Sequence, residues 1–177
     1  KGSKRLKHKN IKKLYGKPII EYTIDAAIKS KLFSKIVISS DIHKLQKLCK
    51  KKSIFFENRK KGLSGDNVGV VDVCLDLLKK DTYKVYDTLC VLYATSALRT
   101  SEDIRMTYQK MNKDKNFSMA ITSLSFNPYQ AIKKNSKKYR LCFPNMVDRR
   151  IKANFFIDNG STYFANTKYF KKEKTFY

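Results

Sequence analysis

Apolar residues recur along this chain at two spacings, every three or four residues in some segments and in short runs in others. The first spacing places apolar side chains on one face of a helix, and the second is typical of buried strands. Helical spacing covers residues 18–31, 42–49, 70–78 and 104–111. Short apolar, β-branched or aromatic runs cover residues 36–38, 54–56, 88–93, 119–124 and 161–165.

Candidate capping residues support three of these helices. Pro18 suits a first helical turn, because its missing N–H falls where a helix has no internal acceptor. Asp41 directly follows a predicted strand and is expected to cap the next helix. Thr100 and Asp103 form a capping-box pattern ahead of the helix at 104–111.

Strands that alternate with helices predict an α/β fold with a mostly parallel sheet and helices on both of its faces. The run at 88–93 is apolar almost throughout, so we expect it to lie centrally in the sheet. In such sheets the ligand crevice lies beyond the carboxyl ends of the strands. The polar loops after Ile38, Phe56, Leu92 and Leu124 are therefore expected to line it.

The length of 177 residues fits a single domain. Within it, residues 126–160 are polar, rich in aromatic residues and poorly periodic, which predicts an excursion from the core. The chain opens at Lys1 with loop-forming residues and no strand before them. A basic Gly-Ser loop usually follows a strand, so we expect that a first strand of the fold lies outside this chain.

The chain is strongly basic, with 39 Lys and Arg against 15 Asp and Glu and a formal net charge of +24. Such a charge makes a polyanion the first partner to consider, and a basic nucleic-acid-binding module is one alternative. Only seven of the basic residues are Arg, the side chain that phosphate clamps and base readers favour. The lysine excess therefore predicts a generally basic surface and no nucleic-acid partner.

The four cysteines, at positions 49, 74, 90 and 142, are widely spaced and contain no C-x-x-C pair. This spacing predicts reduced core thiols, with a disulfide or reactive thiol as the alternative. No apolar run reaches the roughly 18–20 residues of a membrane span. The first 20 residues also lack the apolar core of a signal peptide, so we expect a cytoplasmic protein with no membrane partner.

Three segments carry side chains suited to an anionic small molecule. Residues 2–10 offer close backbone approach, a hydroxyl and positive charge to phosphates, although a solvated basic loop has the same composition. Residues 93–99 combine hydroxyls with one Arg, which suits a polyhydroxylated anion or a plain strand-to-helix turn. The pair at 149–150 is either a bidentate carboxylate site or two exposed arginines.

Several motifs, spread over nearly the whole chain, match one enzyme family. They are K-G-S-K-R-L-x-x-K-N-I at 1–11, L-x-G-K-P-I-I at 14–20, I-V-I-S-S-D at 36–41, A-T-S-A-L-R-T at 94–100, N-P at 127–128 and D-N-G-S-x-Y-F at 158–164. In this order they resemble the cytidylyltransferases that activate nine-carbon acidic sugars, the family of CMP-N-acylneuraminate (CMP-sialic acid) synthetase and its pseudaminate and legionaminate relatives. The G-K-P motif is shared with other sugar nucleotidyltransferases, so an enzyme for another base or sugar is the alternative.

The resemblance implies a Rossmann-like three-layer nucleotidyltransferase fold of the glycosyltransferase-A type. It also implies transfer of CMP from CTP to a nonulosonic acid, with release of pyrophosphate and Mg²⁺ as the cofactor. The family's first strand and its C-terminal Asp-x-Asp metal segment are expected to lie outside this chain, which leaves no metal ligand within it. Residues 126–160 resemble the dimerisation excursion of the family, which implies a homodimer.

The same resemblance assigns roles to individual residues. Lys9 would stabilise charge on the α-phosphate, and Arg149 would engage the sugar carboxylate, so both are implied to be catalytic. The implied nucleotide-binding residues are Gly2, Ser3, Lys4, Asn10, Arg59 and Asn67. The implied sugar-binding residues are Tyr93, Thr95, Ser96 and Arg150.

Two motifs point to different sugars. The sequence Tyr-Ala-Thr at 93–95 looks like the pseudaminate branch of the family. The sequence Asp-Asn-Gly at 158–160, with Tyr163 and Phe164 after it, looks like the sialate branch. Sialic, pseudaminic and legionaminic acid therefore all remain candidates.

Overall fold

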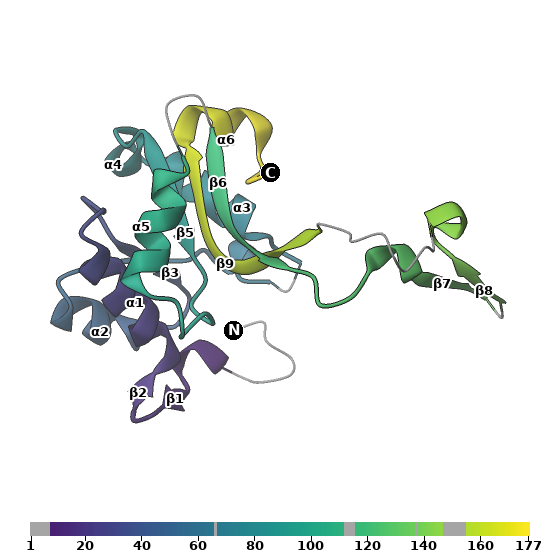
Figure 1. The fold of residues 1–177 in the computed structure, drawn as a ribbon. Helices are drawn as coiled ribbons and strands as arrows, with labels where there is room; N and C mark the ends of the chain where they lie inside the picture. The colour runs from purple at the N-terminus through teal and green to yellow at the C-terminus, as the bar shows by residue number, and fades with distance from the viewer. Residues whose placement is uncertain (1–7, 66, 112–115, 137, 147–154) are drawn as a thin grey trace. The chain divides into compact units, whose positions relative to one another are not determined.

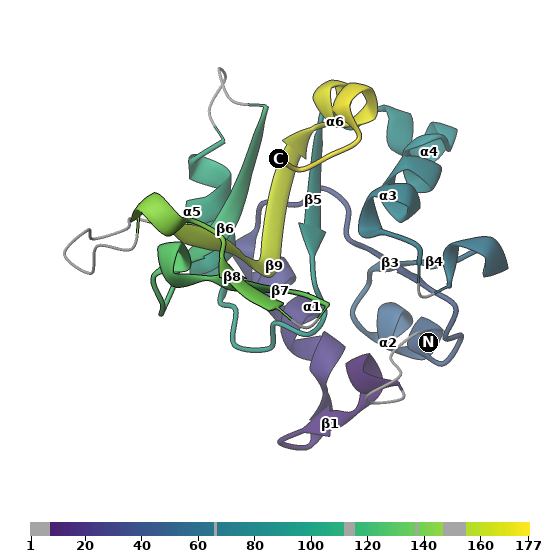
Figure 2. The same ribbon diagram turned by 90° about the vertical axis from the view of Figure 1, so that its right-hand side faces the viewer.

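The computed structural model describes residues 8–65, 67–111, 116–136, 138–146 and 155–177 of the chain (Figures 1 and 2). The chain divides into two compact units. The first comprises Lys1–Met119 and Ser161–Tyr177, and the second comprises Ala120–Gly160. Every candidate site residue that the structure describes belongs to the first unit.

The first unit contains the predicted helices. Its helices are α1 (Ile19–Ser30), α2 (Leu45–Lys51), α3 (Val70–Leu78), α4 (Asp81–Lys84), α5 (Ser101–Gln109) and α6 (Thr167–Glu173), with 3₁₀ turns η1 (Lys9–Ile11) and η2 (Lys61–Leu63). Pro18 immediately precedes α1, as predicted. The capping box ahead of α5 is also confirmed, because the Thr100 hydroxyl accepts from the backbone N–H of Asp103 at 3.1 Å and the Asp103 carboxylate accepts from the N–H of Thr100 at 2.7 Å.

The prediction that Asp41 caps the next helix is wrong. Helix α2 begins at Leu45, and a turn separates it from the preceding strand, with the N–H of Leu45 donating to the carbonyl of Ile42 at 3.0 Å. The hydroxyl of Ser40 accepts from the N–H of Ile42 at 3.1 Å, so a serine side chain stabilises this turn. The intervening turn leaves Asp41 too far from the helix to act as its cap.

The strands form separate sheets. Strand β3 (Val37–Ser40) pairs in parallel with β4 (Phe55–Asn58), and the short strands β1 (Lys13–Leu14) and β2 (Lys17–Pro18) form an antiparallel hairpin. A three-stranded sheet has the order β5 (Thr88–Leu92), β9 (Phe156–Asn166) and β6 (Phe117–Ser123). Strand β5 pairs antiparallel with β9, in a register that places Cys90 opposite Phe164.

This topology departs from the expected sheet. A mostly parallel central sheet is not confirmed, since β5 runs antiparallel to its neighbour β9. The prediction that residues 88–93 lie centrally is wrong, because β5 is the edge strand of its sheet and is not hydrogen-bonded to β3. Leu89 and Val91 pack with one core cluster and Cys90 and Leu92 with another, and all four line a cavity, which together explain an unbroken apolar run in an edge strand.

Alternating residues of β9 pack against helices on the two faces of the sheet (Figures 1 and 2). Tyr163 and Ala165 share a core cluster with residues of α3 and α6, whereas Phe164 packs with Ala26 of α1 and Ile104 of α5. The period of two along a strand accounts for this division. The helices on both faces therefore agree with the predicted α/β layering.

A third core cluster joins α1, β3 and α2. It contains Ile20, Ile24, Ile38, Leu45 and Cys49. All four cysteines of the chain are free, as predicted. Among the residues that the structure describes, no helix has both the length and the apolar character needed to cross a bilayer.

The second unit contains an antiparallel hairpin of β7 (Ile132–Asn135) and β8 (Lys138–Leu141) and the 3₁₀ turns η3 (Pro128–Gln130) and η4 (Pro144–Met146). The Tyr129 ring packs edge-on against the rings of Phe143 and Phe155, with centroids 5.7 and 5.2 Å apart. Several large apolar side chains of this unit are exposed, including Phe126, Ile132, Tyr139 and Phe156.

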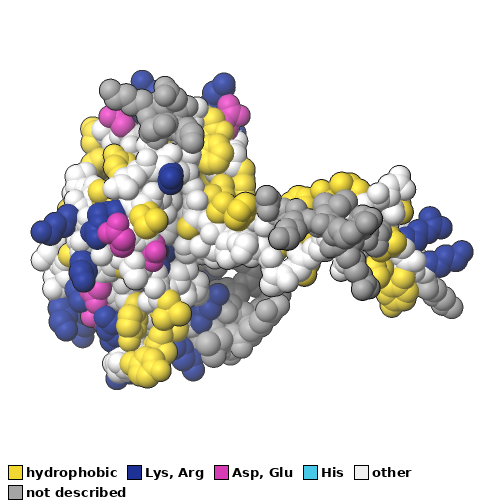
Figure 3. Space-filling model, viewed as in Figure 1, with side chains coloured by type: hydrophobic (Ala, Val, Ile, Leu, Met, Phe, Trp, Pro, Cys, Tyr) yellow, Lys and Arg dark blue, Asp and Glu magenta, His cyan; other side chains and the backbone are white. Residues whose placement is uncertain are grey.

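Basic side chains are scattered over the face of the molecule drawn in Figure 3, with acidic and apolar ones between them. Several lysines pair with carboxylates: Lys60 lies 2.6 Å from Asp76, and Lys80 contacts Glu57. This distribution agrees with a generally basic surface, as the lysine-rich composition predicts.

Candidate functional site

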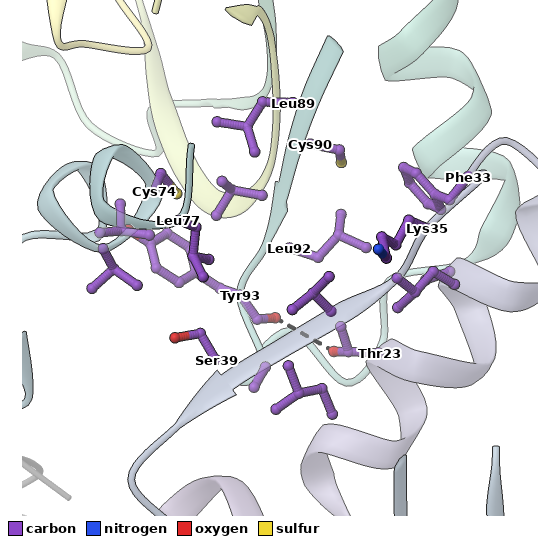
Figure 4. Close-up of a pocket in the computed structure, with 18 of the residues that line it drawn as sticks. Thr23, Phe33, Lys35, Ser39, Cys74, Leu77, Leu89, Cys90, Leu92 and Tyr93 are labelled. Carbon is purple, nitrogen blue, oxygen red and sulfur yellow. Dashed lines mark hydrogen bonds between the residues drawn. The ribbon is translucent and has the colours of Figure 1, made fainter. Parts of the chain in front are cut away.

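A cavity of about 880 Å³ is lined by both β3 and β5, whose edges are not hydrogen-bonded to each other. Apolar side chains, among them Leu77, Leu89 and Leu92, line much of it (Figure 4). Polar lining residues include Ser39 and Ser40, which end β3, and Tyr93, which follows β5. The cavity therefore combines an apolar interior with polar groups at the carboxyl ends of strands, where α/β sheets bind ligands.

Arg59 follows β4 directly and reaches the end of the neighbouring strand β3. Its Nε donates to the hydroxyl of Ser39 at 3.3 Å, and its Nη2 donates to the carbonyl of the same residue. Its backbone N–H donates to the carbonyl of Ser40 at 3.0 Å. Burial lowers the pKa of the guanidinium, while Asp41 and Cys74 act in the opposite direction. Arg59 thus lines the cavity with a fixed, half-buried positive charge that suits a phosphate or a nucleotide.

Asn10, in the η1 turn, is a second polar residue of the cavity lining. Its Oδ1 is buried and has no hydrogen-bond partner among the described residues. Such an atom costs free energy when it remains unpaired, which makes it ready to accept a hydrogen bond from a bound ligand. Its neighbour Lys9 is exposed and does not belong to the cavity lining, so a catalytic role for Lys9 stays a prediction.

The loop after β5 carries the other predicted contacts. Tyr93 lines the cavity, and its carbonyl accepts a hydrogen bond from the Thr23 hydroxyl of α1 at 3.4 Å (Figure 4). The Tyr93 ring packs edge-on against that of Tyr163, with centroids 5.6 Å apart. Thr95 is exposed and Ser96 is half-buried, and neither belongs to the lining.

The structure therefore gathers only part of the predicted site. Asn10, Arg59 and Tyr93 line one cavity, whereas exposed Asn67 lies beside it, next to the lining residues Val68 and Gly69. The remaining candidates, Gly2, Ser3, Lys4, Arg149 and Arg150, lie outside the described residues.

Several lining residues were not among the predicted site residues. Ser39, Ser40 and Asp41 lie at the end of β3, where the strand-end rule already places polar ligand contacts. Thr23 gives no such signal, because it lies inside a helix whose sequence predicts only a packing face. In the described ranges, no three His, Cys, Asp or Glu side chains gather as metal ligands would.

Comparison with known proteins supplies relatives for this fold and cavity. The chain is 30% identical to the pseudaminic acid cytidylyltransferase of Campylobacter jejuni over 182 residues, which cover 97% of the chain and 77% of that protein. It is also 30% identical to the N-acylneuraminate cytidylyltransferase of Streptococcus agalactiae, covering 99% of the chain but 44% of the relative. This chain spans between 26% and 81% of the length of such relatives.

A solved structure of CMP:2-keto-3-deoxy-manno-octonic acid synthetase complexed with CTP superimposes with a TM-score of 0.72 at 15% identity. The superposition covers 97% of this chain and 73% of that one, which shows a shared fold. The sequence profile of a family described as cytidylyltransferase matches residues 1–173. On this match and on the 30% identity to the Campylobacter enzyme, the chain belongs to the cytidylyltransferase family.

Proposed function

We propose that this protein transfers CMP from CTP to the anomeric hydroxyl of a nine-carbon acidic sugar. The anomeric oxygen forms a bond to the α-phosphorus of CTP, the bond from that phosphorus to the departing pyrophosphate breaks, and the hydroxyl proton is lost to water. Because no covalent intermediate with the protein is needed, the protein acts by positioning the substrates and neutralising charge.

The observation that carries this proposal is the pair of polar groups in the cavity. Arg59 presents a guanidinium fixed on Ser39, and Asn10 presents an amide oxygen that no described residue pairs with. Together they offer a cation for phosphate and an acceptor for an N–H or O–H donor of the nucleotide. Membership of the cytidylyltransferase family supports CTP as the nucleotide.

The further roles follow the family resemblance. Ser3 and Lys4 would cradle the β- and γ-phosphates, with Gly2 and Asn67 as further nucleotide contacts. Lys9, directly beside Asn10, would stabilise charge that develops on the α-phosphate.

On the sugar side, the hydroxyls of Tyr93, Thr95 and Ser96 would contact the acceptor. Arg149 and Arg150 would hold its carboxylate. Pseudaminic acid is the first candidate, because Tyr-Ala-Thr at 93–95 looks like that branch and the Campylobacter relative bears that name.

Mg²⁺ is the proposed cofactor, and the protein is proposed to work as a cytoplasmic homodimer. Mg²⁺ is usually held by substrate phosphates and one or two carboxylates. The described residues contain no cluster of three metal-ligating side chains, so no ligand of this chain is assigned to it. The exposed apolar side chains of the second unit, such as Phe126 and Ile132, support a dimer contact there.

The test incubates the purified protein with CTP, Mg²⁺ and, in parallel, pseudaminic, N-acetylneuraminic or legionaminic acid, and measures pyrophosphate release. Turnover is expected with at least one acid, and with pseudaminic acid in particular. No turnover with any of the three would refute the proposal. Thermal shifts with UTP, GTP and ATP test the base, because a larger stabilisation by one of these would indicate a different nucleotidyltransferase.

A matched pair of lysine variants tests the catalytic assignment. Lys9→Ala should remove activity. The free energy of unfolding measured without CTP should stay unchanged, because Lys9 is exposed. Lys12→Ala removes another exposed lysine three positions along the chain and should leave the rate unchanged. An unchanged kcat for Lys9→Ala would exclude Lys9 from the mechanism.

A further inference from the structure

Arg99 is a charged residue buried between β5 and α5. Only 8% of its surface is exposed, although its neighbour Leu98 is 93% exposed. Burying a guanidinium is costly unless its charge or its N–H groups are compensated. Burial lowers the pKa of Arg99, with Cys90 and Asp103 acting in the opposite direction.

The side-chain hydrogen bonds of Arg99 run to two backbone carbonyls, one within β9 and one directly after β5. Its Nη1 donates to the carbonyl of Ser161 in β9 at 2.5 Å, and its Nη2 donates to the carbonyl of Tyr93 after β5 at 3.4 Å. These two residues are themselves joined, because the N–H of Tyr93 donates to the carbonyl of Ser161 at 3.0 Å. Arg99 therefore links the start of the loop after β5 to the neighbouring strand β9 through hydrogen bonds.

The backbone of Arg99 closes the other end of the same loop. Its N–H donates to the carbonyl of Ser96 at 3.2 Å, and the N–H of Ser96 donates to the carbonyl of Tyr93 at 3.3 Å. Thr95 lies within the first of these two turns, and Ser96 takes part in both bonds. Arg99 thus holds the loop at Tyr93 through its side chain and at Ser96 through its backbone.

The guanidinium is not part of an ion pair among the described residues. The nearby Asp103 carboxylate instead accepts from the backbone N–H and the hydroxyl of Thr100. The Nε of Arg99 is buried with no partner in the described part of the chain. A well-packed apolar side chain would avoid this desolvation cost, so stability alone does not explain an arginine here.

We infer that Arg99 is a positioning residue that holds Thr95 and Ser96 in the orientation in which they bind the sugar. The inference rests on the proposed function for its substrate, whereas the loop geometry stands independently of it. Side chains that orient a substrate need fixed supports, because a small displacement of the contacting groups lowers the rate steeply.

The test compares Arg99→Met and Arg99→Lys with Arg105→Met. Arg105 is the matched control, since it is a partly exposed arginine of α5 that pairs with Glu102 at 2.5 Å. Amide hydrogen exchange is measured without ligands over residues 93–99 and over β3 and β4. Exchange in 93–99 should rise about tenfold or more in Arg99→Met, less in Arg99→Lys, and not in Arg105→Met, with β3 and β4 unchanged.

Steady-state kinetics on the same proteins complete the test. The sugar KM should rise about tenfold in Arg99→Met, with partial rescue in Arg99→Lys, while the Kd for CTP stays within about twofold. Unchanged exchange in 93–99, an unchanged sugar KM in an active protein, or an equal loss of sugar and CTP binding would each overturn the inference. If the unsubstituted protein turns over no sugar, the proposed function fails, and the exchange data alone decide whether Arg99 holds the loop.

Discussion

The guanidinium of Arg59 binds Ser39 twice, at the hydroxyl and at the carbonyl, and so joins the end of β4 to the end of β3. The parallel register of these strands places Ser39 opposite Glu57, two residues before Arg59 in the chain. The position of the charge in the cavity is therefore fixed by strand pairing as well as by the side chain.

Arg59→Met should weaken CTP binding by about 10- to 100-fold, because a hydrogen bond to a charged group contributes about 1.5–3 kcal/mol. Isothermal titration with CTP measures the change. Lys60→Met is the matched control, since it removes the neighbouring charge, which is exposed and paired with Asp76. Equal CTP affinity in Arg59→Met and Lys60→Met would exclude Arg59 from nucleotide binding.

Asn10→Ala should have different effects on the free energy of unfolding and on CTP binding. Removing a buried amide oxygen that has no partner in the described part of the chain should leave the free energy of unfolding unchanged or raise it by about 1 kcal/mol. CTP binding should nevertheless weaken, because the ligand loses its acceptor. Thermal melts with and without CTP report both quantities, and Asn135→Ala, at an exposed position of the second unit, should change neither.

Thr100→Ala should lower the free energy of unfolding by about 1 kcal/mol, the usual contribution of a helix N-cap. The variant removes the hydroxyl that accepts from the N–H of Asp103 at the start of α5. Urea denaturation measures the loss. Thr82→Ala, at an exposed position of α4, serves as a comparison and should have a much smaller effect.

The stability of the fold should fall in acid partly through Asp25. Burial raises its pKa, but hydrogen bonds from Lys17 and Lys52, each 2.6 Å away, outweigh this effect, and the pKa lies below its ordinary value of 3.8. A lowered folded-state pKa contributes stability above the unfolded-state pKa, and this contribution is lost as the pH falls through the folded-state value.

Asp25→Asn should therefore be less stable than the unsubstituted protein at neutral pH, and the difference should shrink below about pH 4. Denaturation curves at several pH values measure it. Asp81→Asn is the control, because that carboxylate is 94% exposed and pairs only at the surface with Lys84. A difference that stayed constant with pH would contradict an ionised, ion-paired Asp25.

Local sequence signals predicted the elements of the fold better than their arrangement. Pro18 and the Thr100–Asp103 pair mark helix starts through short-range chemistry, so their positions can be read from the sequence. The position of β5 in its sheet cannot be read from the sequence, because an apolar run looks the same whether it faces another strand or a cavity. Strand order depends on contacts between residues that are distant in the chain.

The site shows the same limit. Arg59 and Tyr93 follow strands, and the strand-end rule brings them to one cavity. Thr23 reaches Tyr93 from inside a helix, and Arg99 reaches Ser161 across 62 positions, so neither contact has a local signature. A motif can identify such residues as belonging to a family, but the bonds that they make depend on the folded chain.

The cavity also leaves β3 and β5 without backbone hydrogen bonds to each other. A ligand that contacts both strands would therefore join two parts of the unit that the backbone does not join. A ligand that binds only the folded chain stabilises it by mass action. Amide hydrogen exchange in β3 and β5 should accordingly slow when a nucleotide that fills the cavity is added.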